Sequence, residues 1–294
     1  MDRPRIGLAL GAGGARGWCH IGVIRGLARL GIVPDVIAGT SMGALVGAAA
    51  AGGALDALED WARAQTRARY LRLVDVRLTG GGLVGGVEIG AVIGGLPMPQ
   101  AVEALPVPFA AVACDIATGE EVWLRDGPVA DAVRASVAMP GVIAAHQRGG
   151  RWLVDGGVVN PIPVVVARAL GAQVVVAVNP NLRPAGQFWR PPPATGTFAD
   201  FLPRLPEAIR GLLPGAARTV DPGPGYLDLV SSTIDILIDR NLRARLAGDA
   251  PDVVLGARLA HLSVFDFHCA AEAIAEGERM VAAQADWIAA CAGV

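Results

Sequence analysis

Residues 34–51 read PDVIAGTSMGALVGAAAA, which is an apolar run, a glycine-flanked turn and then a run of small residues typical of a helix packed on a sheet. The turn contains G-x-S-x-G, with Gly39 and Gly43 on either side of Ser41. In this pattern a sharp strand-to-helix turn exposes the hydroxyl of a nucleophilic serine, and the glycines remove Cβ atoms that would clash. Ser41 is therefore our candidate nucleophile, and the simpler alternative is an ordinary turn serine.

Short apolar runs alternate with helical segments on both sides of this stretch. Strands that alternate with helices predict a three-layer α/β/α fold with a mainly parallel central sheet. In such sheets ligands bind beyond the carboxyl ends of the strands, where Ser41 is expected. The expected strands are 5–10, 36–38, 109–114, 121–124, 152–154 and 174–178, and the expected helices are 17–30, 43–68, 86–95, 128–136, 161–170, 226–246 and 269–288.

We expect one hydrolase domain over residues 1–294, with two irregular segments. Residues 75–100 carry glycine pairs and a triplet among apolar residues, a composition that suits either a mobile lid over a lipophilic site or an ordinary loop. Residues 183–225 are rich in proline and read as an extended excursion. Apolar residues at helical spacing within 198–213 form a stripe that packs on the protein itself or touches a membrane surface or an acyl chain.

Composition excludes several classes of protein. The net charge is −2 without a polybasic block, so the sequence does not indicate nucleic-acid binding. Apolar residues make up 53% of the chain, yet no run reaches the length of a membrane-spanning helix, and no secretory signal is recognisable at the start. We expect a cytoplasmic protein, with peripheral membrane contact allowed. The sequence does not determine its oligomeric state.

Neither a metal nor an organic cofactor is expected. The four cysteines lack the spacing of a zinc site or of a disulfide framework, and no acidic loop could hold calcium.

A second glycine-rich segment, GAGGARG at residues 11–17, follows the first expected strand. Successive glycines expose backbone N–H groups at the start of a helix, which suits either a phosphate or an oxyanion. A dinucleotide site is disfavoured because G-x-G-x-x-G fails in both registers: counting from Gly11 places Arg16 sixth, and counting from Ala12 lacks the first glycine.

A serine nucleophile needs a base, and the sequence offers two kinds. The chain order of an α/β-hydrolase triad would leave His261 or His268, but neither lies in a loop flanked by turn residues. Asp155 ends an expected strand and precedes Gly156 and Gly157. A carboxylate that is partly desolvated and unpaired has a raised pKa and can accept the serine proton, although an Asp before two glycines can also simply form a turn.

Taken in order, these segments resemble the patatin-like phospholipase family in its bacterial branch, and are similar to the esterase region of neuropathy target esterase. The resemblance rests on GAGGARG at 11–17, HIGV at 20–23, GTSMG at 39–43 and DGGVVNPIP at 155–163. It covers roughly residues 5–180 and continues more weakly through the C-terminal helices.

The resemblance implies that Ser41 is the nucleophile and Asp155 the general base of a dyad without histidine. It implies an oxyanion loop at Gly13 and Gly14 with the Arg16 region, bounded by Gly11 and Gly17. Ala12 stands where many relatives have glycine. ASVAMPG at 135–141 matches a further family segment, which we interpret as structural and lining the approach to Ser41.

The implied activity is hydrolysis of lipid acyl esters, of the phospholipase A, lysophospholipase or carboxylesterase type, through a covalent acyl-enzyme. Two alternatives stay open. One is an acyltransferase that uses the same dyad. The other is a non-catalytic module that binds a nucleotide or phosphate at Gly11–Gly17.

Overall fold

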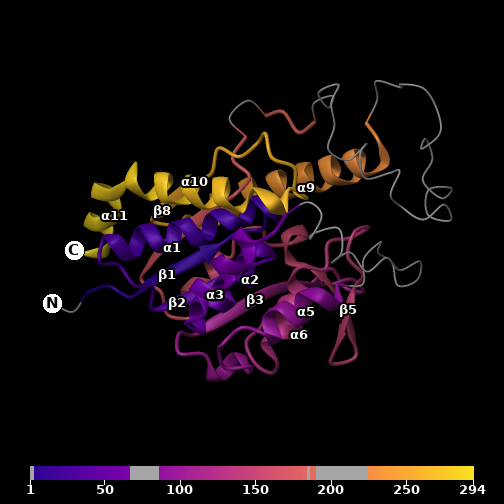
Figure 1. Cartoon of the computed structure of the whole chain (residues 1–294), viewed down its shortest axis with the longest axis horizontal. Coiled ribbons are helices and arrows are strands. Elements are labelled where there is room, and N and C mark those ends of the chain that lie inside the picture. The colour runs from indigo at the N-terminus through magenta and orange to yellow at the C-terminus, as the bar shows by residue number, and fades with distance from the viewer. Residues whose placement is uncertain (1–2, 67–85, 184–185, 190–223) are drawn as a thin grey trace. The chain divides into compact units, whose positions relative to one another are not determined.

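The computed structural model describes residues 3–66, 86–183, 186–189 and 224–294 (Figure 1). By internal contacts the chain divides into two compact units, Met1–Leu182 with Ile238–Val294, and Arg183–Leu237. Most of the second unit lies outside the described residues. The expectation of one domain over 1–294 therefore stays a prediction.

The larger unit is built on one sheet with the strand order β5-β6-β3-β2-β1-β7-β8, and β4 also pairs with β3. The pairs of β1 with β2 and β7, of β2 with β3 and of β7 with β8 are parallel, whereas β4 and β6 run antiparallel to β3, and β5 antiparallel to β6. The mainly parallel sheet that the sequence predicts is confirmed. The strands are β1 Ile6–Leu10, β2 Val36–Thr40, β3 Phe109–Asp115, β4 Glu121–Leu124, β5 His146–Arg148, β6 Arg151–Asp155, β7 Val174–Asn179 and β8 Val253–Gly256.

Helices cover both faces of this sheet, because successive side chains of each buried strand point to opposite faces. On one face Leu8 and Leu10 of β1 pack into a core with α1, α2 and α10. On the other face Ala9 packs with α7 and with the part of α9 that belongs to the larger unit. The helices are α1 Cys19–Arg29, α2 Met42–Ala51, α3 Leu55–Arg63, α5 Val87–Gly94, α6 Val129–Ser136, α7 Val164–Ala169, α9 Tyr226–Gly248, α10 Ala270–Ala282 and α11 Ala285–Ala292.

Helices α1 and α10 lie side by side, although more than 200 residues separate them (Figure 1). Glycines make this approach close: a Cβ on Gly22 would lie 1.9 Å from the carbonyl oxygen of Ile274, and one on Gly277 would lie 2.0 Å from that of Cys19. The C-terminal helices are thereby fixed against the segment that follows the glycine loop.

Several expected elements differ from the structure. The helix expected at 43–68 is two helices, because the chain turns at Gly52 and Gly53, the latter with φ +76°. The helix expected at 269–288 likewise divides into α10 and α11. Strands β5 and β8 have no counterpart in the sequence prediction.

Two predicted segments fall partly or wholly outside the described residues. Of the glycine-rich segment 75–100, only residues 86–100 are described, and they include α5. The apolar stripe at 198–213 lies wholly outside. The lid and the membrane-contacting stripe therefore stay predictions. None of the described helices is both long and apolar enough to cross a membrane.

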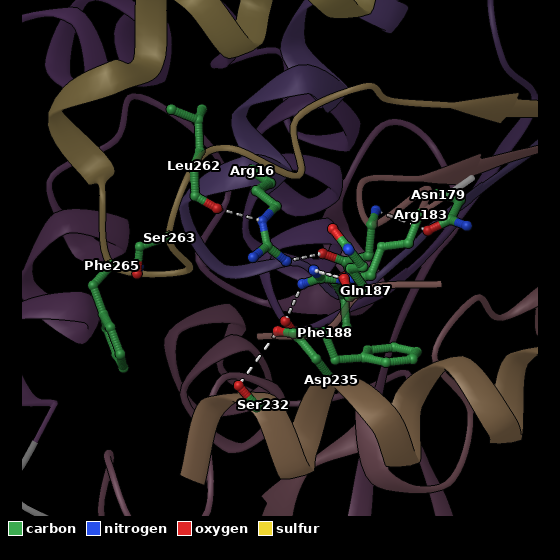
Figure 2. Close-up of polar contacts among 12 residues, drawn as sticks. Arg16, Asn179, Arg183, Gln187, Phe188, Ser232, Asp235, Leu262, Ser263 and Phe265 are labelled. Atoms are coloured by element: carbon green, nitrogen blue, oxygen red, sulfur yellow. Dashed lines mark hydrogen bonds and ion pairs between the residues drawn. The ribbon is translucent and has the colours of Figure 1, made fainter. Parts of the chain in front are cut away.

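The second unit is described around Arg183 and the beginning of α9. The Arg183 guanidinium forms a buried ion pair with Asp235 and lies 5.4 Å from the ring centre of Phe188. The Ser232 hydroxyl donates to the carbonyl oxygen of Phe188 at 3.3 Å (Figure 2). These contacts hold residues 186–189 against the helix.

Candidate active site

Ser41 occupies the corner between β2, which ends at Thr40, and α2, which begins at Met42. Its backbone has φ 57° and ψ −123°, and it is the only non-glycine residue with positive φ in the described ranges. Such a conformation costs on the order of 1–3 kcal/mol and persists only where its surroundings fix it. The flanking glycines are sterically required: a Cβ on Gly43 would lie 2.0 Å from the oxygen of Leu10, and one on Gly39 would lie 2.3 Å from that of Gly43.

The side chain of Ser41 meets that of Asp155. Ser41 Oγ donates to Asp155 Oδ2 at 2.5 Å, and both residues are buried, with 4% and 5% of their surface exposed. Strand β3 brings them together, because it pairs on one side with Thr40 through Val112 and on the other with Asp155 through Ala113. The two residues that the sequence singled out are thus adjacent across 114 positions of chain.

Burial raises the pKa of Asp155 from 3.8 to about 6, while the hydrogen bonds from Ser41 and Gly157 act in the opposite direction. Its second oxygen, Oδ1, accepts the Gly157 N–H at 2.7 Å. Asp155 forms no ion pair with any residue in the described part of the chain. The carboxylate is therefore ionised at neutral pH and still basic enough to accept a proton.

The glycine loop follows β1 and is pinned by its own backbone. Gly11 N–H donates to Val178 O at 3.0 Å, Ala12 N–H to Pro161 O at 2.9 Å, and Ala15 N–H to Val264 O at 2.8 Å. Between them, the N–H groups of Gly13 and Gly14 have no acceptor among the residues that the structure describes. Gly14 has φ +53°, which glycine adopts without cost. The Gly13 and Gly14 N–H groups are thus two neighbouring donors within a loop that is fixed on both sides.

Arg16, predicted as part of an oxyanion loop, has its guanidinium buried in a different contact. Its Nε donates to the carbonyl oxygen of Leu262 at 2.9 Å (Figure 2), and its Nη1 donates to Asn181 Oδ1 at 2.8 Å. Asn181 in turn donates through Nδ2 to Ala12 O at 2.7 Å. Arg16 and Asn181 therefore clamp the glycine loop to two distant segments. The oxyanion role of the Arg16 region stays a prediction that concerns its backbone.

The turn after Asp155 is held by a polar chain that sequence reasoning missed. Asn160 O accepts the Thr40 hydroxyl at 2.9 Å, and Asn160 Nδ2 donates to Glu121 Oε1 at 2.8 Å. Arg245 donates to the other oxygen of Glu121 at 2.8 Å. No local pattern marks Glu121 or Arg245 as part of this chain, because Asn160 lies 39 positions and Arg245 lies 124 positions from Glu121.

Within the described ranges, the hydrogen bonds of the Ser41 N–H and hydroxyl go to Ser136 and Asp155, and none involves a histidine. His20 donates through Nε2 to Gly11 O at 2.8 Å, and burial lowers its pKa to about 4, so that it stays neutral and braces the glycine loop. His261 pairs with Glu272 at 2.6 Å on the exposed surface, and His146 lies 3.4 Å from Asp131. Within the described residues, no group of three or more His, Cys, Asp or Glu side chains could hold a metal ion.

The model of the patatin-like phospholipase family matches residues 8–168, more than half of the chain, and this range contains the glycine loop, Ser41 and Asp155. The chain belongs to the patatin-like phospholipase family. Membership implies a lipid hydrolase that acts on lipid substrates.

The curated relatives of this patatin-like protein match different shares of its length. An uncharacterized NTE family protein of Mycobacterium tuberculosis is 34% identical, over 96% of this chain and 91% of the relative. Mouse patatin-like phospholipase domain-containing protein 7 is 32% identical, over 60% of this chain and 14% of the mouse protein. Among solved structures, VipD from Legionella pneumophila aligns with 96% of this chain and 77% of its own at 11% identity and a TM-score of 0.40.

Proposed function

We propose that the protein hydrolyses lipid acyl esters, with Ser41 as the nucleophile and Asp155 as the general base of a two-residue dyad. The observation that carries this proposal is the 2.5 Å hydrogen bond from Ser41 Oγ to Asp155 Oδ2. The strained backbone of Ser41 and the raised pKa of Asp155 support it, because strain and shifted pKa values gather at catalytic sites.

In the acylation step Ser41 Oγ attacks the ester carbonyl carbon while its proton moves to Asp155 Oδ2. The carbonyl oxygen becomes an oxyanion, which the N–H groups of Gly13 and Gly14 can stabilise as preorganised donors. Collapse of the tetrahedral intermediate breaks the ester C–O bond, and Asp155 returns the proton to the departing alcohol. The acyl group is left on Ser41.

In the deacylation step a water molecule takes the place of the alcohol. Asp155 accepts its proton, the hydroxide attacks the acyl carbonyl carbon, and the bond to Ser41 Oγ breaks. The proton returns to Ser41 Oγ, and the fatty acid leaves. One carboxylate thus serves both half-reactions, first as base and then as acid.

A fluorophosphonate probe tests the nucleophile, because only an activated serine is phosphonylated. We expect labelling of the wild type at Ser41 and none of Ser41→Ala. Ser232→Ala is the matched control, since Ser232 lies on α9 and its hydroxyl donates to Phe188 O. A wild type that is not labelled, or labelling that survives in Ser41→Ala, would contradict the dyad.

The substrate class is tested by hydrolysis of a panel with Ser41→Ala as the background. The panel contains diacyl phospholipid, lysophospholipid, triacylglycerol and a short p-nitrophenyl ester, offered as monomers, micelles or vesicles as solubility allows. We expect fatty-acid release from at least one lipid that Ser41→Ala does not support. Faster turnover of vesicles than of micelles would support the peripheral membrane contact that the sequence allows.

A further inference from the structure

A third side chain, Ser136, bonds to the backbone of the nucleophile. The Ser41 N–H donates to Ser136 Oγ at 2.8 Å, and Ser136 Oγ donates to the carbonyl oxygen of Val112 at 2.5 Å. Ser136 is fully buried at the end of α6. Because a carbonyl oxygen can only accept, the serine hydrogen must point to Val112, and the lone pairs of the oxygen then face Ser41. The hydroxyl therefore connects the residue that follows β2 with strand β3: it accepts the Ser41 N–H and donates to the Val112 carbonyl oxygen.

This bridge lies where the sheet can no longer hold Ser41. The last registered pair of β2 with β3 is Thr40 with Val112, and the backbone then takes the positive-φ conformation of Ser41. The buried N–H of Ser41 has left the ladder and needs another acceptor, because a buried unpaired N–H is destabilising. Ser136 Oγ supplies that acceptor and links it to the neighbouring strand.

The same segment also touches the other member of the dyad. The Asp155 N–H donates to Ala138 O at 2.9 Å, two residues after Ser136. Gly156 packs against the carbonyl that Ser136 bonds, since a Cβ there would lie 2.3 Å from Val112 O. Residues 136–138 thus contact the backbone of Ser41 and of Asp155, which are otherwise remote in the chain.

We propose that Ser136 is a positioning residue that holds Ser41 in its strained backbone conformation and, together with the carbonyl of Ala138, keeps Ser41 and Asp155 in register. This proposal rests on the proposed function. It gives the segment 135–141, which the sequence alone suggested as a lining of the approach, a direct role in the geometry of the dyad.

Ser136→Ala tests this role, because it removes both the acceptor of the Ser41 N–H and the hydroxyl that donates to Val112 O. We expect kcat and the rate of fluorophosphonate labelling to fall about 10- to 100-fold, with KM changed less than threefold, since misplacement of a reacting group costs rate rather than affinity. Val133→Ala is the matched control: Val133 is buried one turn earlier on α6 and does not bond to the dyad. Ser136→Thr, which keeps the hydroxyl, should recover at least part of the rate.

Two further readouts separate positioning from loss of stability. The hydrogen bond from Ser41 lowers the pKa of the Asp155 carboxyl. Displacing Ser41 weakens this bond and should therefore raise that pKa. The acidic limb of the rate profile should then move to higher pH in Ser136→Ala and stay in place in Val133→Ala. Amide exchange in a peptide that covers residues 37–45 should also become faster in Ser136→Ala.

Equal kcat values for Ser136→Ala and Val133→Ala at equal folded fraction would overturn the proposal, and so would unchanged exchange at Ser41. A wild type without any esterase activity would instead contradict the proposed function. In that case the exchange measurement still decides whether Ser136 holds the corner.

Discussion

The turn at Ser41 and the glycine loop at residues 11–17 pack against each other, since a Cβ on Gly17 would lie 2.4 Å from Met42 Cβ, but they are held in different ways. The turn arises from adjacent residues: a buried strand, two glycines that fit only without Cβ atoms, and a helix that begins at Met42. The loop is pinned by Leu262 and Val264, about 250 positions away, and by Asn181. The corner of the proposed nucleophile is therefore built locally, whereas the placement of the proposed oxyanion donors depends on the C-terminal part of the chain.

This difference predicts how each region fails. Changes to the dyad remove the chemistry itself, so their effects should be large. Changes to the clamp of the loop shift donors that remain present, so their effects should be intermediate and should grow with the displacement of the loop.

The largest effect is expected for Asp155→Asn, which removes the base while keeping the shape. We expect kcat/KM to fall about 10³- to 10⁴-fold, at the upper end of what general-base catalysis contributes. Steady-state hydrolysis of a p-nitrophenyl ester measures it. Asp115→Asn is the matched control, because Asp115 is equally buried at the end of β3 without contacting Ser41. An Asp155→Asn variant that keeps a tenth or more of the wild-type kcat/KM would contradict the assignment of Asp155 as the base.

Gly14→Ala should give the next largest effect, because Gly14 is where the glycine loop contacts Val264 of the C-terminal segment. The new Cβ would lie 2.5 Å from Val264 O at a residue with φ +53°. We expect kcat to fall about 10²-fold, as when one oxyanion donor is lost. Gly31→Ala shares the positive φ, at +76°, but meets open space, so it should destabilise the protein without changing kcat. Equal kcat in the two variants would remove the loop from the mechanism.

Asn181→Ala loosens the clamp without adding bulk. It removes the bonds to Ala12 O and to Arg16 Nη1, so kcat should fall about tenfold and the free energy of unfolding by about 1–3 kcal/mol. Denaturant titration and steady-state kinetics measure the two quantities. Gln173→Ala is the control. It loses the hydrogen bond that the Gln173 side-chain oxygen accepts from the Arg5 N–H, at the opposite end of β1, and should leave kcat unchanged. A similar kcat for both variants would mean that the loop does not need its distant anchor.

The pH dependence should report on the dyad and not on the loop. Asp155 must be ionised to act as a base, and burial raises its pKa to about 6, so kcat/KM should rise with pH through about 6 and fall about tenfold from pH 8 to pH 5. Because the folded pKa exceeds the unfolded value of 3.8, the native state holds its proton more tightly, and this carboxyl makes unfolding easier as pH rises from about 4 to about 6. Asp155→Asn should lack that slope. A flat rate profile across pH 5–8 would contradict a carboxylate base.

The smallest effects are expected for His261→Ala and His268→Ala. His261 is exposed and bonded to Glu272, and the Ser41 hydroxyl is bonded to Asp155, so neither variant should change kcat/KM more than twofold. The same ester assay applies. A loss of 100-fold or more in either variant would restore a histidine-dependent triad.

Much of the fold could be predicted because its signals are local. All six expected strands exist within one or two residues of their predicted bounds, since buried parallel strands read as short apolar runs between turns. Strand β5 has only three residues, and β8 pairs with β7 some 75 residues earlier in the chain, so neither produces a pattern of its own. The break between α2 and α3 was missed because Gly52 and Gly53 follow a run of alanines that continues the helical pattern.

The sequence by itself determined the central sheet, the corner at Ser41 and the candidacy of Asp155, because strand patterns, glycines at close approaches and a carboxylate at a strand end are written in neighbouring residues. Only the tertiary structure decided which partners these residues have. Strand β3 sets Asp155 beside Ser41, Ser136 Oγ accepts the Ser41 N–H, and the Arg16 guanidinium bonds to Leu262 and Asn181. These contacts join residues that are remote in the chain, and their geometry follows from sheet order and helix packing, to which no local pattern points.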